Sequence, residues 1–140
     1  MKKSLFLFAV LFTAVGAFAQ TKPFQASLTP KIAVHRSDVK IEGLALNIWG
    51  ENPQRALAIG VVNGSTGNSA GFSLGLLLNY ADNYKGVQWA PVNYTRGKFL
   101  GWQNGFINYN GSHMKGVQTG CVNYASGLQG LQLGLFNFAN

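Results

Sequence analysis

The sequence contains one cysteine, Cys121, and only four acidic residues among 140. The acidic residues are Asp38, Glu42, Glu51 and Asp82. A single cysteine excludes a disulfide framework within the chain, even in an exported compartment where disulfides form. Because the four carboxylates are scattered and none stands at calcium-loop spacing, they give little support to paired-carboxylate catalysis or to calcium binding.

The two histidines, His35 and His113, are also isolated, without further metal-ligating residues at ligand spacing. Cys121 occupies a repeat position that is apolar elsewhere, which favours a small apolar side chain over a nucleophile. The glycines recur at strand alternation and no helix follows them, so they do not form a phosphate loop. We therefore predict no catalytic, cofactor-binding or metal-binding residues, no cofactor and no enzymatic activity.

Helical periodicity is absent as well. Apolar residues do not recur every 3.6 residues, and 18 glycines are too many for helices. Alternation by two is clear instead: one face of a strand reads Phe99, Gly101, Gln103, Gly105 and Ile107. The pattern predicts an all-β protein without helices in the mature chain.

Residues 1–19 have the pattern of a secretory signal peptide. Lys2 and Lys3 precede an apolar run, and Ala-Phe-Ala at 17–19 forms a small-x-small cleavage site. The run is shorter than the roughly 18 residues that a membrane span needs. We predict an exported protein with a single repeat β domain over 20–140.

The mature chain is basic, with nine lysines and arginines against four acidic residues, a formal charge of +5. Several basic residues fall at predicted turns rather than on one face with aromatic residues, so we expect no nucleic-acid partner. For an exported protein, outer-membrane lipid or lipopolysaccharide is a possible partner of these groups, and solvated turns are the simpler interpretation. A protein or glycan partner is not specified by the sequence.

A repeat of about 15 residues dominates the chain. The units begin at Ala56, Gly71, Gly86, Gly101, Gly116 and Gly130. An asparagine recurs within each unit, at Asn63, Asn79, Asn93, Asn108, Asn123 and Asn137. The unit at Gly71 has one extra residue, Leu78, which indicates a bulge.

Short turn segments such as 95–97 and 110–112 separate the units and predict hairpins between antiparallel strands. In such a hairpin, each glycine or alanine would lie opposite a larger side chain. The predicted fold is an antiparallel β-meander of about eight strands, barrel-like or a single sheet. The strands are expected at 24–35, 39–49, 56–63, 71–80, 84–94, 99–109, 114–124 and 128–138.

A β-solenoid is the alternative fold, in which each unit forms one coil and identical residues stack in ladders. The recurrence of asparagine, glutamine and tyrosine in register favours it. A 15-residue coil must turn several times, however, and only one turn signal is visible in each unit. We therefore predict the meander ahead of the solenoid.

The strands have two different faces. Val87, Trp89 and Pro91 lie on an apolar face, glutamines lie on the other, and Tyr94 and its equivalents lie near strand ends. This arrangement is typical of a transmembrane β-barrel, and a secreted sheet with one buried face is the other interpretation. The tryptophans, Trp49, Trp89 and Trp102, could stack on sugars but more often serve in packing or at a lipid interface.

The Gly-Val-Gln-x-Gly-x-x-Asn-Tyr units, preceded by residues 44–54, resemble the uncharacterised surface-repeat proteins of Gram-negative bacteria. The resemblance implies export and association with the outer membrane or cell surface, and it implies no activity and no functional residues. Outer-membrane barrels commonly finish on an aromatic residue, whereas this chain reads Phe138-Ala139-Asn140, which suggests a truncated member. The predicted function is a structural or surface-interaction role without catalysis, or alternatively a secreted β-solenoid that binds a glycan or a protein.

Overall fold

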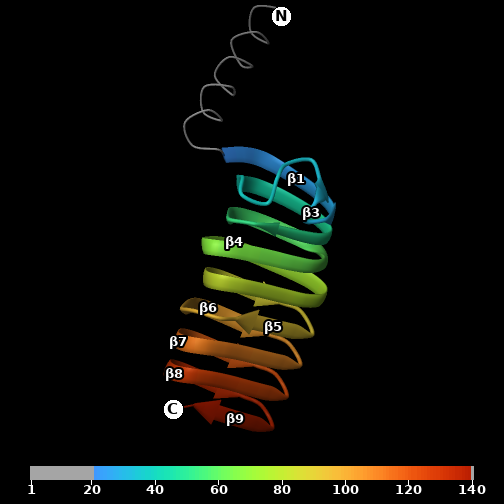
Figure 1. Cartoon of the computed structure of the whole chain (residues 1–140). Helices are drawn as coiled ribbons and strands as arrows, with labels where there is room; N and C mark the ends of the chain where they lie inside the picture. The colour runs from blue at the N-terminus through green and yellow to red at the C-terminus, as the bar shows by residue number, and fades with distance from the viewer. Residues whose placement is uncertain (1–20, 140) are drawn as a thin grey trace, which may run out of the picture.

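The computed structural model describes residues 21–139 as an all-β solenoid of about seven turns. The chain winds as a stack of flat coils, with β1 at one end and β9 at the other (Figure 1). The predicted signal peptide lies outside the described residues. Within them the prediction of an all-β chain without helices is confirmed, and no helix is present that could span a membrane.

One sheet of nine strands contains almost the whole described chain. The strands are β1 (Thr21–Thr29), β2 (Ile32–Ala33), β3 (Lys40–Asn52), β4 (Gln54–Trp89), β5 (Val92–Thr95), β6 (Phe99–Asn104), β7 (Ile107–Thr119), β8 (Val122–Leu133) and β9 (Phe136–Ala139). Their order is β2-β1-β3-β4-β5-β7-β8-β9, and β6 pairs with β4 and β7. Strand β4 is long because it continues round successive coils without a break.

Every pairing between successive coils is parallel, so the predicted antiparallel meander is wrong and the solenoid alternative is confirmed. The described strands do not close into a barrel. Equivalent repeat positions lie side by side, as in Gly86 beside Gly101 and Tyr94 beside Tyr109. The β1–β2 hairpin is the one antiparallel pair in the described sheet.

A second bend in each coil explains the error. The chain turns at Ala90-Pro91 and again at Gly105-Phe106, in the middle of what reads as one long alternating strand. Gly120-Cys121 and Gly134-Leu135 bend in the same way. Because each bend is only two residues long and carries apolar side chains, it resembles continued strand in the sequence.

The first glycine of each unit is needed because the coils stack glycine on glycine. Gly101 has φ +137°, and a Cβ atom there would lie 1.8 Å from the carbonyl oxygen of Gly86. A Cβ atom at Gly116 would lie 1.9 Å from the carbonyl oxygen of Gly101. The expectation that each glycine faces a larger cross-strand partner is therefore wrong, because the partner is another glycine.

The interior is lined by asparagine amides. Each Asn Nδ2 donates to the Oδ1 of the asparagine in the next coil, across 2.8–3.1 Å, in a ladder that runs from Asn47 to Asn137. From Asn63 to Asn123 these side chains are fully buried. Buried amides are costly unless they are paired, so the ladder requires neighbouring units to stay in register.

A second amide ladder runs in the opposite sense. Gln132 Nε2 donates to Gln118 Oε1, Gln118 to Gln103, and Gln103 to Gln88, across 2.7–3.0 Å. The prediction that the glutamines lie on a polar face, away from the apolar one, agrees with this arrangement. That polar face is the inside of the solenoid.

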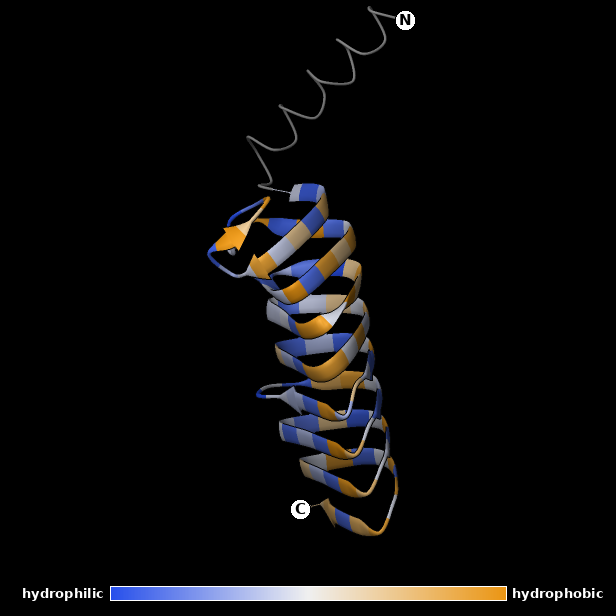
Figure 2. Cartoon of the chain, turned by 90° about the vertical axis from the view of Figure 1, so that its right-hand side faces the viewer, coloured by the Kyte–Doolittle hydropathy of each residue, from blue (hydrophilic) through white to orange (hydrophobic). Residues whose placement is uncertain are grey.

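Beside the two ladders the interior contains an apolar cluster. Tyr84, Phe99 and Met114 lie one above another from coil to coil, with Ala81 and Ala125 beside them. Figure 2 shows hydrophilic and hydrophobic residues alternating along the coils, as expected when side chains point alternately in and out.

The extra residue of the Gly71 unit is absorbed at the bend. Leu78 pairs with Val92, and Asn79 still bonds to Asn93, so the strand after the bend keeps its register. Two exposed residues, Leu76 and Leu77, therefore occupy the bend where Pro91 stands alone in the next coil. The insertion enlarges the outside of the solenoid and leaves the interior ladder unchanged.

Candidate functional site

A groove of about 790 Å³ runs along the stack over several coils. It lies on the side where the three-residue turns occur, between these turns and the following strand. Its lining residues are Asn68, Ser69, Asn83, Tyr84, Lys85, Lys98, Phe99, Leu100, Ser112, His113, Lys115 and Gln129. We call this groove the basic groove.

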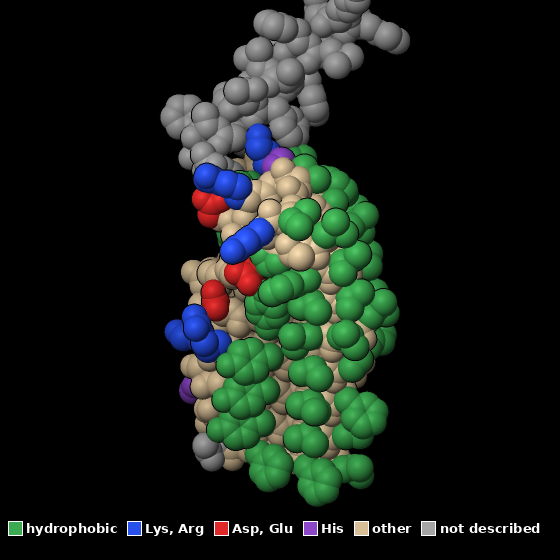
Figure 3. All heavy atoms as spheres, turned by 45° about the vertical axis from the view of Figure 1, so that its right-hand side comes forward, with side chains coloured by type: hydrophobic (Ala, Val, Ile, Leu, Met, Phe, Trp, Pro, Cys, Tyr) green, Lys and Arg blue, Asp and Glu red, His purple; other side chains and the backbone are tan. Residues whose placement is uncertain are grey.

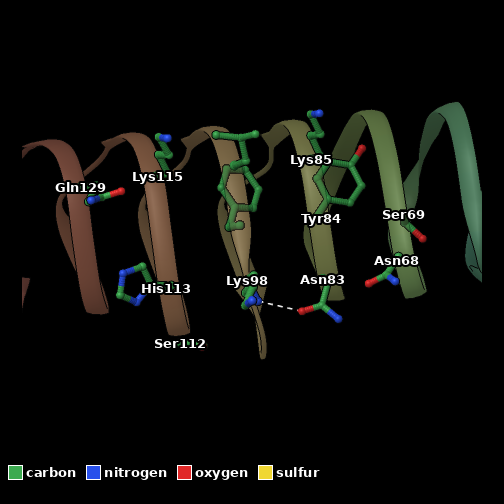
Figure 4. A pocket seen from close by; sticks show the side chains of 12 residues that line it. Asn68, Ser69, Asn83, Tyr84, Lys85, Lys98, Ser112, His113, Lys115 and Gln129 are labelled. Atoms are coloured by element: carbon green, nitrogen blue, oxygen red, sulfur yellow. Dashed lines mark hydrogen bonds between the residues drawn. The ribbon is translucent and has the colours of Figure 1, made fainter.

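The repeat places the lysines of the basic groove. Lys85 and Lys115 occupy the same outward position two coils apart, each just before the first glycine of its unit. In Figure 4 they project from one side of the groove. Lys98 and His113 come from the turns on the other side, one coil apart.

Hydrogen bonds across coils hold the turns in place. The backbone N–H of Lys98 donates to Asn83 Oδ1 at 2.8 Å, which is drawn in Figure 4. Asp82 accepts from the N–H of Gly67 at 2.9 Å and pairs with Arg96 at 3.2 Å. The side chains that border the groove therefore start from a backbone fixed by its neighbours.

The floor of the groove is aromatic and neutral. The rings of Tyr84 and Phe99 stack with centroids 5.9 Å apart and an interplanar angle of 16°. The Tyr84 hydroxyl lies 3.0 Å from Ser73 Oγ, and burial raises the pKa of this phenol to about 12. Because both side chains are almost completely buried, the floor provides rigidity and no exposed ring face.

The groove carries positive charge that no neighbour neutralises. None of its twelve lining residues is acidic. No described carboxylate lies within salt-bridge distance of Lys85, Lys98 or Lys115, whereas the nearby Asp82 is paired with Arg96. The three ammonium groups are therefore available to an anionic ligand.

The outer surface of the solenoid is otherwise strongly apolar. Figure 3 shows hydrophobic side chains covering the front and right of the stack, with the charged side chains along its left edge. The most exposed hydrophobic side chains lie at the bends, where Leu76 is 73%, Phe106 68% and Leu135 79% exposed. We call the bend residues Leu76, Leu77, Pro91, Phe106, Cys121 and Leu135 the bend ridge.

Aromatic residues flank the bend ridge on both sides. Trp89 and Trp102, which we call the Trp border, lie with ring centroids 5.8 Å apart. On the other side Tyr94, Tyr109 and Tyr124 form a Tyr ladder, with centroids 5.0 and 4.9 Å apart and nearly parallel rings. In-register stacking of the tyrosines is what the solenoid alternative predicted.

The residues that the sequence singled out are not brought together. His113 lines the basic groove, whereas His35 lies near the β1–β2 hairpin, where its backbone exchanges hydrogen bonds with the Gln25 side chain. Burial, and then the charge of Lys22, lower the pKa of the His35 imidazole. Cys121 is a free, half-buried thiol on the bend ridge. No group of three or more metal-ligating side chains occurs within the part of the chain that the structure describes.

The tryptophans are on the outer surface. Trp49 Nε1 donates to the Tyr80 hydroxyl at 3.0 Å, and that hydroxyl donates to Glu51. Burial, followed by the bond to Glu51, raises the pKa of Tyr80 to about 12. This small network belongs to the N-terminal coils and lies outside the basic groove.

Sequence reasoning missed the basic groove because it treated the lysines as separate turn residues. The available signal was their spacing: Lys85 and Lys115 are two repeats apart, and Lys98 and His113 are one repeat apart. Only in a solenoid does one repeat equal one coil, so that such residues meet on one side. An antiparallel meander would have separated alternate units.

In comparisons with protein-family models, curated proteins and solved structures, nothing matches this chain. The resemblance to surface-repeat proteins therefore stays a prediction that rests on the repeat itself. Inferences about function rest on the basic groove, the bend ridge and the residues around them.

Proposed function

We propose that this chain is an exported, non-catalytic β-solenoid binding module whose basic groove holds an acidic glycan. The observation that carries the proposal is the set of three lysines without ion pairs along one groove. Amide and hydroxyl groups of Asn68 and Ser112 lie along the same groove. Ammonium, amide and hydroxyl groups are the donors and acceptors that carboxylated or sulfated sugars require.

The direction of the groove suits a linear polymer. Successive coils are separated by the spacing of paired strands, about 4.8 Å, so Lys85 and Lys115 stand about 10 Å apart along the axis. Lys98 lies in the coil between them, on the opposite side. An extended chain with regularly repeated negative groups could pair with the three cations in turn.

Charge and hydrogen bonding, rather than ring stacking, would provide recognition. The aromatic floor is covered, with Tyr84 3% and Phe99 2% exposed. In the Tyr ladder, each ring covers the face of its neighbour. A neutral glycan that relies on exposed aromatic faces is therefore a poorer fit than an acidic one.

The test is titration calorimetry with a polygalacturonate oligosaccharide, compared with a neutral maltooligosaccharide of equal length. Binding of the acidic probe should weaken at least about tenfold in the double variant Lys85→Ala with Lys115→Ala, since each lost charge-assisted bond is worth more than about 1 kcal/mol. It should also weaken as salt rises. The matched control is Lys22→Ala with Lys31→Ala, which removes the same charge outside the groove.

Two results would contradict the proposal. One is equal affinity for the acidic and the neutral oligosaccharide. The other is an equal loss of affinity in the two double variants, which would indicate attraction to net charge alone.

Export to the outer membrane or cell surface is part of this proposal. It is supported by the signal-peptide pattern of residues 1–19 and by the exposed apolar side chains of the solenoid. Localisation of the processed chain by cell fractionation tests it, and recovery of the unprocessed chain in the cytoplasm would contradict it.

A further inference from the structure

From the arrangement around the bends we infer that the solenoid docks side-on onto an anionic phospholipid surface. The bend ridge enters the apolar layer, and the long axis of the stack lies along the membrane plane. The apolar contact does not involve the basic groove, because Phe106 and Leu135 do not line that groove. Only the preference for anionic lipid uses Lys85 and Lys115, which do line it.

The side of the stack can enter an apolar layer because its backbone groups at the bends are paired. The N–H of Ala90 donates to Asn104 O, and that of Gly105 donates to Thr119 O. The N–H groups of Cys121 and Val122 both donate to Phe106 O. Backbone polar groups must be satisfied within the protein before they leave water, and the N–H groups of Ala90, Gly105, Cys121 and Val122 meet this condition.

Along each coil the side chains follow the order that proteins show across a membrane interface, with aliphatic residues at the bend and tryptophan or tyrosine beside it. The bend ridge is mainly aliphatic, with Phe106 among its most exposed members. The Trp border stands on one side of it and the Tyr ladder on the other. Tryptophan and tyrosine favour the headgroup level, where one part of the ring is apolar and its polar atom stays hydrated.

Two polar residues, Asn104 and Thr119, lie beside the Trp border and would oppose contact with lipid if their polar atoms were unpaired. Thr119 Oγ1 lies 2.8 Å from Trp102 Nε1 and 2.7 Å from the Asn104 amide. These groups bond to one another, so their polar atoms do not require water on the outer side. Asn104 and Thr119 therefore do not interrupt the apolar surface with unpaired polar atoms.

Charge selects the kind of surface. Lys85 and Lys115 occupy the outward strand position next to that of Trp102, further from the bends, and have no ion pairs to described residues. Basic residues beside an apolar face strengthen binding to anionic lipids. A symmetric pair of antiparallel chains joined through the ridge would bring the two lysine borders towards each other, which opposes that arrangement of a second copy.

The experiment is flotation of the purified protein with vesicles of phosphatidylethanolamine and phosphatidylglycerol. The wild-type protein should float with these vesicles and bind less to phosphatidylcholine vesicles. The variant Phe106→Asp should partition into the vesicles at least roughly tenfold more weakly than the wild type, because it removes a phenyl group that the lipid would bury and adds a charge. Circular dichroism should show unchanged β structure, since Phe106 is exposed.

Two controls match this variant. Ser37→Asp introduces the same charge at an exposed position that belongs neither to the ridge nor to the basic groove, and it should float like the wild type. The exchange Phe106→Leu with Leu135→Phe keeps the ridge apolar and should also float. Loss of flotation in either control would overturn the proposal, because the effect would not depend on the apolarity of the ridge.

Two further results would overturn it. The first is flotation of Phe106→Asp that equals the wild type. The second is a lipid-free dimer, seen by sedimentation velocity, that Phe106→Asp dissociates, since the ridge would then bind a second copy of this chain. Addition of a soluble acidic oligosaccharide should leave the ridge contact with phosphatidylcholine unchanged, which separates this proposal from the function of the groove.

Discussion

Asn108 donates its Nδ2 to Asn123 Oδ1 across 2.8 Å, in the next coil of the solenoid. The same Nδ2 also donates to the carbonyl oxygen of Thr119 at 2.9 Å, and Asn108 Oδ1 accepts from Asn93. The side chain is fully buried. From Asn63 to Asn123 each amide in the ladder is thus used on both sides, which makes a polar interior compatible with a stable fold.

Replacing Asn108 by alanine should lower the free energy of unfolding by about 2–4 kcal/mol, because it leaves buried amide groups of Asn93 and Asn123 with fewer partners. Urea denaturation followed by circular dichroism measures the change. The control is Asn137→Ala, in the last described coil, where the side chain is exposed and the loss should stay below about 1 kcal/mol. Equal losses at the two positions would show that the buried ladder is not a main source of stability.

Gly101→Ala should destabilise the protein by more than about 3 kcal/mol or prevent folding, because its Cβ would collide with the backbone oxygen of Gly86 and no flexible side chain can move away. Gly67→Ala is the control. Gly67 also has a positive φ, +61°, but a Cβ there has nothing within 4 Å, so the cost should be about 1 kcal/mol. Thermal unfolding of both variants tests the difference. A mild effect of Gly101→Ala would mean that the coils are not packed as closely as the structure shows.

Stability should fall in alkali because Tyr84 is buried. Its folded-state pKa is about 12, against 10.0 for the free side chain. The folded protein therefore binds this proton more tightly than the unfolded chain, and stability is complete below about pH 10 and is lost as the pH rises towards 12. The shift corresponds to roughly 2–3 kcal/mol.

Urea denaturation at intervals between pH 8.5 and pH 11.5 measures this alkaline loss. In Tyr84→Phe the loss should be shallower, because one of the two tyrosines with a raised pKa is gone and only the contribution of Tyr80 remains. The variant also leaves Ser73 Oγ without its phenol partner, so its stability near neutral pH should fall by about 1 kcal/mol. An unchanged slope would show that Tyr84 does not become more difficult to ionise on folding.

The Tyr ladder should contribute through its rings and not through the hydroxyl of its central member. Tyr109 stacks on Tyr94 and Tyr124 with rings almost parallel. Tyr109→Ala should therefore cost about 1–2 kcal/mol and reduce the near-ultraviolet circular dichroism of the stacked rings. Tyr109→Phe should have almost no effect on stability, and a large effect would indicate a hydrogen bond that the ring geometry does not reveal.

Much of the fold could be predicted from the alternation and the repeat. Both indicated strands, a polar face of glutamines and a regular succession of units, and the ladders of the alternative fold were correctly placed at the asparagine and tyrosine positions. The choice between antiparallel and parallel neighbours was wrong. The prediction failed because a bend such as Gly105-Phe106 contains no residue that differs clearly from a strand residue. One of the two turns in each coil could therefore not be recognised from the sequence.

The candidate sites were less predictable than the fold. Lys85, Lys98 and Lys115 are unremarkable one by one, and their common groove exists only when one repeat corresponds to one coil. The extra residue Leu78 likewise indicated a bulge within a strand, whereas the structure absorbs the insertion at a bend, with Leu76 and Leu77 on the outside. In both cases the function of a residue depends on which neighbouring coil it meets.

The sequence by itself determined the repeat, the strand content and which residues alternate, because these depend on local periodicity and on residue type. Only the tertiary structure decided that the polar face turns inward and that glycine stacks on glycine. The reason is that a buried asparagine is stable only when an equivalent asparagine lies one coil away. Parallel winding supplies that partner at every step, and it leaves the apolar side chains of the bends on the outside.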